Sequence, residues 1–152
     1  MNGFRAALAA DGILIFDGGM GSLLQRRGLA PGQSPEEFGM AHPEIIADIH
    51  AGYACSGSRV VTTNTFGATR YKLPAGLDVF AVNELMARTA RRAVGGGVFV
   101  AGSVGPTGKM VHPLGDISFR GLVEVFKEQI RGLAAGGADV ILAETQFDLA
   151  EA

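Results

Sequence analysis

Three features that the sequence lacks exclude several classes of protein. The 152 residues include one cysteine, Cys55, so no internal disulfide can form, and the cytoplasm is the expected compartment. No apolar run approaches the roughly 20 residues of a membrane-spanning helix, and the N-terminal stretch lacks the apolar segment of a signal peptide. The basic residues are scattered and the net charge is −2, so no nucleic-acid-binding face is expected.

Glycine is the residue present in excess, with 23 copies among the 152 residues. The glycines form no repeat but cluster directly before and after short apolar runs, where they punctuate secondary structure. Hydrophobic residues make up 47% and charged residues 18%, which is typical of a globular domain with a core.

Four short apolar runs predict four β-strands, at residues 13–16, 60–63, 98–101 and 140–143. Each run is rich in β-branched or large apolar residues without strict alternation, which is typical of strands buried on both faces of a parallel sheet. Amphipathic patterns between the runs predict helices at residues 42–55, 78–94 and 118–135. Ser118 is expected to cap the last of these helices, and Glu84 is expected to pair with Arg88.

This alternation of strands and helices is compatible with a doubly wound sheet or a (β/α)8 barrel. A doubly wound nucleotide-binding fold predicts phosphate-binding glycines after the first strand. The segment 17–22, Asp-Gly-Gly-Met-Gly-Ser, fits neither G-x-G-x-x-G nor a P-loop with its lysine. The prediction is therefore an α/β protein, the N-terminal half of a (β/α)8 TIM barrel with about four βα units.

Half a barrel leaves two unpaired strand edges, which proteins normally avoid. We therefore expect residues 1–152 to form a single partial barrel domain, from the first strand to the fourth and the start of the next helix. The chain is expected either to be a fragment of a longer protein or to associate with another copy through its edges.

Polar residues directly follow three of the predicted strands, where a barrel carries its chemistry. Asp17, followed by Gly18 and Gly19, is either a turn residue that caps a helix or a carboxylate at the barrel mouth, with glycines that let substrate approach the backbone. Asn64 either forms an Asx-turn or orients a polar substrate. Glu144 is costly to bury unpaired, which favours a role facing a ligand. Two carboxylates indicate acid–base chemistry or recognition of an ammonium group.

Other candidates are weaker. The glycine-rich segment 102–108 reads as a flexible loop or as the wall of a pocket. His112 stands alone in a loop, so we expect no catalytic role for it. Cys55 is expected to be a buried structural cysteine, because it lies on a helix that packs outside the barrel. A single cysteine without clustered histidines predicts no metal site in this chain.

Five stretches, taken in order, resemble the homocysteine S-methyltransferase domain, which also opens cobalamin-dependent methionine synthases. They are residues 16–22 (FDGGMGS), 42–44 (HPE), 63–67 (TNTFG), 102–108 (GSVGPTG) and 143–145 (AET). The loop that ends in GPTG, followed by PLGD at 113–116, is most similar to the methionine synthase branch. The resemblance covers nearly the whole chain.

The resemblance implies a barrel that binds homocysteine and a zinc ion held by three cysteines, which favours the thiolate form of the substrate sulfur. The two carboxylates match the family's acidic residues near the substrate's amino group, so their expected role is to position the substrate. No residue is assigned to catalysis. The substrate-binding residues that the resemblance implies are Asp17, Gly18, Gly19, Asn64, Thr65 and Glu144.

The family's zinc cysteines lie in the second half of its barrel and have no counterpart here, so zinc ligands are expected outside this chain. Methylcobalamin or another methyl donor would serve the full-length enzyme, and this chain alone is expected to be inactive. Two alternatives stay open. One is a non-catalytic half-barrel that binds a small amino acid or assembles with a partner. The other is a barrel lyase or aldolase that uses Asp17 and Glu144, for which the sequence shows no catalytic lysine.

Overall fold

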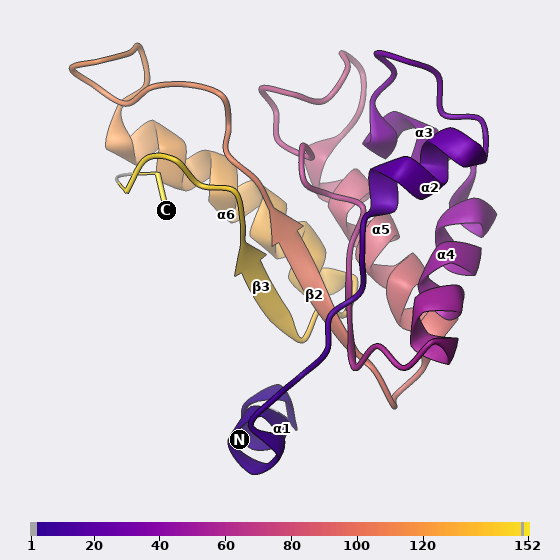
Figure 1. The fold of residues 1–152 in the computed structure, drawn as a ribbon. Helices are drawn as coiled ribbons and strands as arrows, with labels where there is room; N and C mark the ends of the chain where they lie inside the picture. The colour runs from indigo at the N-terminus through magenta and orange to yellow at the C-terminus, as the bar shows by residue number, and fades with distance from the viewer. Residues whose placement is uncertain (1–2, 150) are drawn as a thin grey trace.

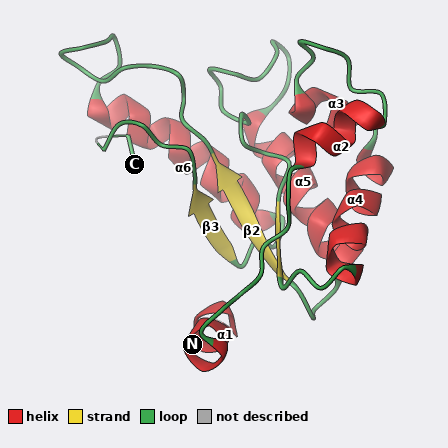
Figure 2. Ribbon diagram, viewed as in Figure 1, coloured by secondary structure: helices red, strands yellow, loops and turns green. Residues whose placement is uncertain are grey.

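A computed structural model describes residues 3–149 and 151–152 as a small parallel sheet with its longer helices on one of its faces (Figures 1 and 2). The strands are β1 (Val60–Thr62), β2 (Phe99–Val104) and β3 (Val140–Ala143), hydrogen-bonded in the order β1-β2-β3. The longer helices are α4 (Pro43–Cys55), α5 (Val79–Val94) and α6 (Phe119–Ala135). The shorter ones are α1 (Gly3–Asp11), α2 (Met20–Arg26) and α3 (Pro35–Ala41). The predicted order of parallel strands and intervening helices is confirmed.

The first predicted strand, residues 13–16, differs from expectation because it is reduced to a single bridge. Phe16 pairs in parallel with Val60, and the backbone N–H of Asp17 donates to the Val60 carbonyl at 2.9 Å. Ile13 and Ile15 are 80% and 61% exposed, and no described strand pairs with the other edge of their segment. Within the described residues the sheet therefore has three strands and one bridged segment, rather than four full strands.

The three predicted helices begin one residue after the expected positions, because the first expected residue of each is the N-cap. Ser118 accepts a hydrogen bond from the Gly121 N–H at 3.1 Å, as expected of a capping side chain. Glu84 and Arg88 form the expected pair at 2.9 Å. The apolar patterns of the sequence predicted none of α1, α2 and α3, which have nine, seven and seven residues.

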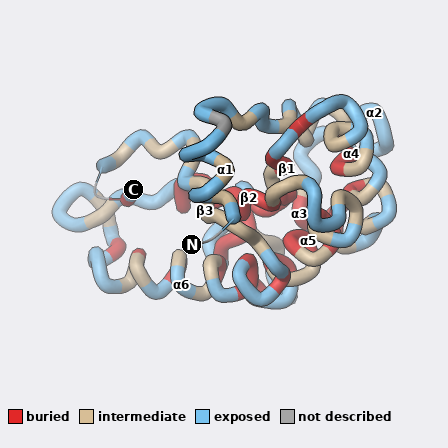
Figure 3. The backbone as a smooth tube through the Cα atoms, turned by 90° about the horizontal axis from the view of Figure 1, so that it is seen from below, coloured by how far each residue is buried: buried red, intermediate tan, exposed pale blue. Residues whose placement is uncertain are grey.

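The core lies between the sheet and the helices, as the red stretches of the tube in Figure 3 show. The apolar stripe of α5 faces inward, with Val82, Met86 and Ala90 fully buried. Val60 and Val100, from β1 and β2, are also fully buried. This packing fixes the carboxyl ends of the strands relative to one another, and those ends carry the polar residues singled out above.

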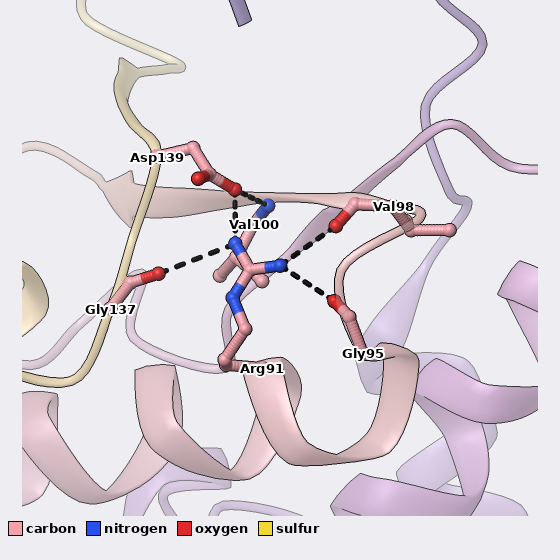
Figure 4. Close-up of polar contacts among 6 residues, drawn as sticks. All are labelled: Arg91, Gly95, Val98, Val100, Gly137 and Asp139. Atoms are coloured by element: carbon pink, nitrogen blue, oxygen red, sulfur yellow. Dashed lines mark hydrogen bonds and ion pairs between the residues drawn. The ribbon is translucent and has the colours of Figure 1, made fainter. Parts of the chain in front are cut away.

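Arg91 ties α5 to the amino ends of β2 and β3 (Figure 4). Its guanidinium donates to the carbonyl oxygens of Gly95 at 2.8 Å and Val98 at 2.9 Å, and it pairs with the carboxylate of Asp139. Asp139 also accepts a hydrogen bond from the Val100 N–H at 2.8 Å. The cluster lies at the opposite end of the strands from the polar residues, so we assign it to stability.

Cys55 is exposed, so the expectation of a buried structural cysteine is wrong. It is the last residue of α4, where Ser56 and Gly57 turn the chain toward β1, and the turn leaves its side chain outside the core. None of the described helices is long and apolar enough to cross a membrane.

Candidate functional site

A cavity of about 1060 Å³ lies at the carboxyl ends of the strands. Its walls come from the segment after the first bridge, from the ends of β1, β2 and β3, and from α2, α3 and the loop before α3. In Figure 1 these two helices stand beside the upper ends of the strands. Asp17, Gly18, Gly19, Asn64 and Glu144 all line the cavity, so residues up to 127 positions apart in the sequence meet there (17 to 144).

Asp17 is held by the end of β1. Its two carboxylate oxygens accept hydrogen bonds from the backbone N–H and the hydroxyl of Thr62, both at 2.8 Å. Asp17 therefore caps no helix, and the N-cap of α2 is Gly19. Burial raises the pKa of Asp17 above its ordinary 3.8, against the opposing effect of the Thr62 hydrogen bonds, and the negative charge of Glu144 raises it further.

Glu144 follows β3 directly and is half-buried. Its backbone N–H donates to the Val104 carbonyl at 3.1 Å, and its carboxylate accepts a hydrogen bond from the Ser103 hydroxyl at 2.5 Å. The next residue, Thr145, has a φ of 57°, which is rare for a β-branched residue and recurs at functional sites. The chain thus turns sharply just after Glu144, while Ser103 fixes the direction of its carboxylate.

Asn64 lines the cavity but forms no Asx-turn. Its side-chain amide donates to the carbonyl of Pro35 at 2.7 Å, so it bridges β1 to the start of α3. Thr65 is fully buried and lies outside the cavity lining. The Thr65 hydroxyl donates to the Ser103 carbonyl at 2.8 Å, which anchors the loop 63–67 to β2.

Gly18 and Gly19 pass close to the side chain of Tyr53 on α4. A Cβ atom on Gly18 would lie 2.9 Å from the Tyr53 hydroxyl oxygen, and this hydroxyl donates to the Gly19 carbonyl at 3.2 Å. A larger residue at position 18 would push this segment toward the cavity. The absence of a side chain at position 18 therefore lets this segment pack against Tyr53.

The segment 102–108 differs from the flexible loop that its glycines suggested. Residues 102–104 belong to β2, and residues 101–107 are all buried. Of this segment, Ser103 alone among the described residues lines the cavity. The Gly105 N–H donates to the Phe66 carbonyl at 3.1 Å, so the segment holds the neighbouring loop in place.

Several residues that line the cavity received no role from the sequence, among them Thr62, Ser103, Glu36 and Lys72. Thr62 and Ser103 are polar residues near the ends of otherwise apolar strands, and this pattern could have identified them as candidates for the site. Lys72 places its Nζ 5.2 Å from the centre of the Phe66 ring. His112 is exposed and does not line the cavity.

The residues of this cavity do not fit a zinc ion, which prefers cysteine and histidine ligands. Across the described part of the chain, no group of three or more His, Cys, Asp or Glu side chains could hold a metal ion. Cys55 lies outside the cavity lining. Besides the ammonium group of Lys72, the cavity offers several oxygen acceptors, among them the carboxylates of Asp17 and Glu144, and such acceptors suit a cationic group.

The fold and the cavity define a partial (β/α)8 barrel with carboxylates at the carboxyl ends of its strands. The chain belongs to the homocysteine S-methyltransferase family, whose model matches residues 14–152. It is similar to the homocysteine methyltransferase MmuM from Escherichia coli at 27% identity, with TM-scores of 0.85 for the metallated form and 0.86 for the oxidized form. The apo form gives 26% identity and a TM-score of 0.76. The match covers 99% of this chain and 59% of the metallated enzyme, so the chain spans about three fifths of that protein.

Proposed function

We propose that this chain supplies the part of a homocysteine S-methyltransferase that binds the amino-acid end of homocysteine. Asp17 and Glu144 would bind the substrate's ammonium group, Asn64 would orient it, and Gly18 and Gly19 would let it approach the backbone. The observation that carries the proposal is the convergence of Asp17, Asn64 and Glu144 on one cavity. Membership of the family supports homocysteine as the substrate.

The electrostatics of the cavity favour a cation there. Burial raises the pKa of Asp17, and the charge of Glu144 adds to this effect, so the ionised form of Asp17 is disfavoured in the empty cavity. A substrate ammonium group between them would stabilise both charges through charge-assisted hydrogen bonds. Ser103 and Thr62 each hold one of the carboxylates in place, so little side-chain freedom would be lost on binding.

The further parts of the proposal concern what lies outside this cavity. Zinc, held by ligands outside this chain, would favour the thiolate of homocysteine. The segments GPTG and PLGD favour the methionine synthase branch, in which methylcobalamin donates the methyl group. A cytoplasmic location is part of the same proposal.

A calorimetric titration of this chain with L-homocysteine under reducing conditions tests the proposal. We expect measurable binding, weakened at least about fivefold by Asp17→Asn or by Glu144→Gln, because each removes one charged partner. Asp48→Asn is the control, since Asp48 pairs at the surface with Arg27 at 3.7 Å and lies outside the cavity lining. Equal binding of an analogue without the α-amino group would contradict the proposal.

A zinc titration tests where the metal ligands lie. We expect no tight stoichiometric zinc binding by this chain, and such binding would refute the assignment of the metal ligands to another part of the protein. Homocysteine binding without any activity when the remaining barrel is supplied would favour the non-catalytic half-barrel. The lyase alternative loses its basis because the family match is to methyltransferases.

A further inference from the structure

The start of α3 holds the loop 63–67 through two hydrogen bonds. The Asn64 side-chain amide donates to the Pro35 carbonyl at 2.7 Å, and the Gly67 backbone N–H donates to the Glu36 carboxylate at 2.6 Å. The other oxygen of that carboxylate accepts a hydrogen bond from the Ser34 hydroxyl at 2.7 Å. The contacts join residues 29 and 31 positions apart, so they fix α3 against the end of β1.

Glu36 is a buried carboxylate that the proposed binding of the ammonium group does not use. Its side chain lines the cavity, yet the residue is 6% exposed. A buried carboxylate is costly unless donors satisfy it. Gly67 and Ser34 supply these donors, and Glu36 forms no ion pair within the described residues. This carboxylate is therefore committed to holding the loop.

Two glycines permit the tight contact between α3 and the loop. A Cβ atom on Gly39 would lie 2.8 Å from the Asn64 Nδ2, and a Cβ atom on Gly67 would lie 2.9 Å from the Glu36 Oε1. Either methyl group would push the loop and the helix apart. The two glycines thus allow α3 and the loop 63–67 to approach each other closely at the two contact points.

The hydrogen bond between Asn64 and Pro35 determines which atom of the Asn64 amide remains available to a ligand. Because Nδ2 donates to Pro35, the oxygen Oδ1 is left over, and it accepts no hydrogen bond from any described residue. We propose that Glu36 is a positioning residue, which holds the loop so that Asn64 offers a hydrogen-bond acceptor to the ligand beside Asp17 and Glu144. The identity of that ligand rests on the function proposed above.

The test compares Glu36→Ala with the conservative Glu36→Gln, whose side-chain oxygen can still accept from the Gly67 N–H. We expect Glu36→Ala to raise the Kd for L-homocysteine about tenfold, and Glu36→Gln to restore it to within about threefold of the unmodified chain. Glu44→Ala is the control, because Glu44 is an exposed glutamate in the first turn of α4, outside the cavity lining.

Nuclear magnetic resonance supplies a readout that needs no ligand. We expect the Gly67 amide to lose protection from hydrogen exchange and the Asn64 side-chain amide signals to shift in Glu36→Ala, but not in Glu36→Gln. If these signals stay unchanged in Glu36→Ala, the positioning role is refuted whether or not homocysteine binds. If they change while the Kd stays constant, the role in the site is also refuted.

A second variant keeps the inference testable if Glu36→Ala does not fold. Gly39→Ala leaves Glu36 intact but places a methyl group 2.8 Å from the Asn64 Nδ2. We expect it to shift the Asn64 signals and raise the Kd at least about fivefold. Failure of the unmodified chain to bind homocysteine, with the predicted signal changes present, would refute the proposed function and leave the positioning of Asn64 intact.

Discussion

His50 makes the stability of the chain depend on pH in a way that can be calculated. It lies on α4, is fully buried, and neither ring nitrogen has a hydrogen-bond partner within the described residues. Burial lowers the pKa of His50 from 6.5 to about 4, because the charged form would lose its hydration. The folded chain therefore holds His50 neutral at pH values where the unfolded chain binds a proton.

The sign and size of the effect follow from linkage. The unfolded state binds more protons between about pH 4 and 6.5, so the free energy of unfolding falls as the pH drops through this window. The full loss is about 3 kcal/mol, at about 1.36 kcal/mol for each pH unit, and about 2 kcal/mol of it is present at about pH 5. This is a large share of the stability of a typical domain.

Urea unfolding followed by far-UV circular dichroism, at about pH 7.5 and about pH 5, measures the effect. We expect His50→Leu, which cannot titrate, to lose about 2 kcal/mol less than the unmodified chain between these conditions. The control is Ile46→Val, a buried substitution on the same helix that lowers stability by about 1 kcal/mol at both pH values. A fall in stability that is the same with and without His50 would refute the reasoning.

Three further predictions test other parts of the chain. Arg91→Met should lower the free energy of unfolding by about 2 kcal/mol, since Asp139 and three carbonyls lose a charged donor. Arg92→Met, at the exposed neighbouring position, should change the free energy little. Equal effects of the two substitutions on urea unfolding would contradict this. The open edges should make the chain self-associate in sedimentation velocity experiments, and Ile15→Lys, at a 61% exposed edge position, should reduce the association; a monomer at all concentrations would argue against the edge. The affinity for L-homocysteine should weaken as the pH falls through the raised pKa of Asp17, because protonation removes the charge that attracts the ammonium group; calorimetry of Asp17→Asn should show weak binding without this dependence.

Strand ends were the part of the site that the sequence could predict. In a parallel barrel, a polar residue directly after a buried apolar run lies at the carboxyl end of a strand. Asp17, Asn64 and Glu144 could therefore be expected to meet at one end of the sheet. The cavity brings these three together. Thr65 is also a polar residue near a strand end, but its hydroxyl donates to the Ser103 carbonyl and the residue does not line the cavity. Only the structure shows which polar side chains face the cavity and which face the core.

Partners that lie far apart in the sequence could not be predicted. Glu36 reads as an ordinary residue in the first turn of a helix, and its bond to Gly67 depends on how α3 sits against β1. The reduced first strand has a similar cause. Its residues have strand-like composition, but a strand needs neighbours, and Phe16 has one bridge partner, Val60. Local composition carries no information on whether these neighbours are present.

Under the proposed function, the chemistry of the cavity divides recognition of the substrate between its two ends. Carboxylate and amide oxygens bind an ammonium group well but are poor partners for a thiolate, which calls for a soft metal ion or a cationic group. Asp17, Glu144 and Asn64 are therefore suited to discriminate at the amino end of the substrate, independently of what holds the sulfur. Because such interactions are the same before and during methyl transfer, they contribute to substrate affinity and orientation rather than to the rate of the chemical step. On this argument, losing a carboxylate should weaken substrate binding in the complete enzyme while changing the turnover of bound homocysteine much less.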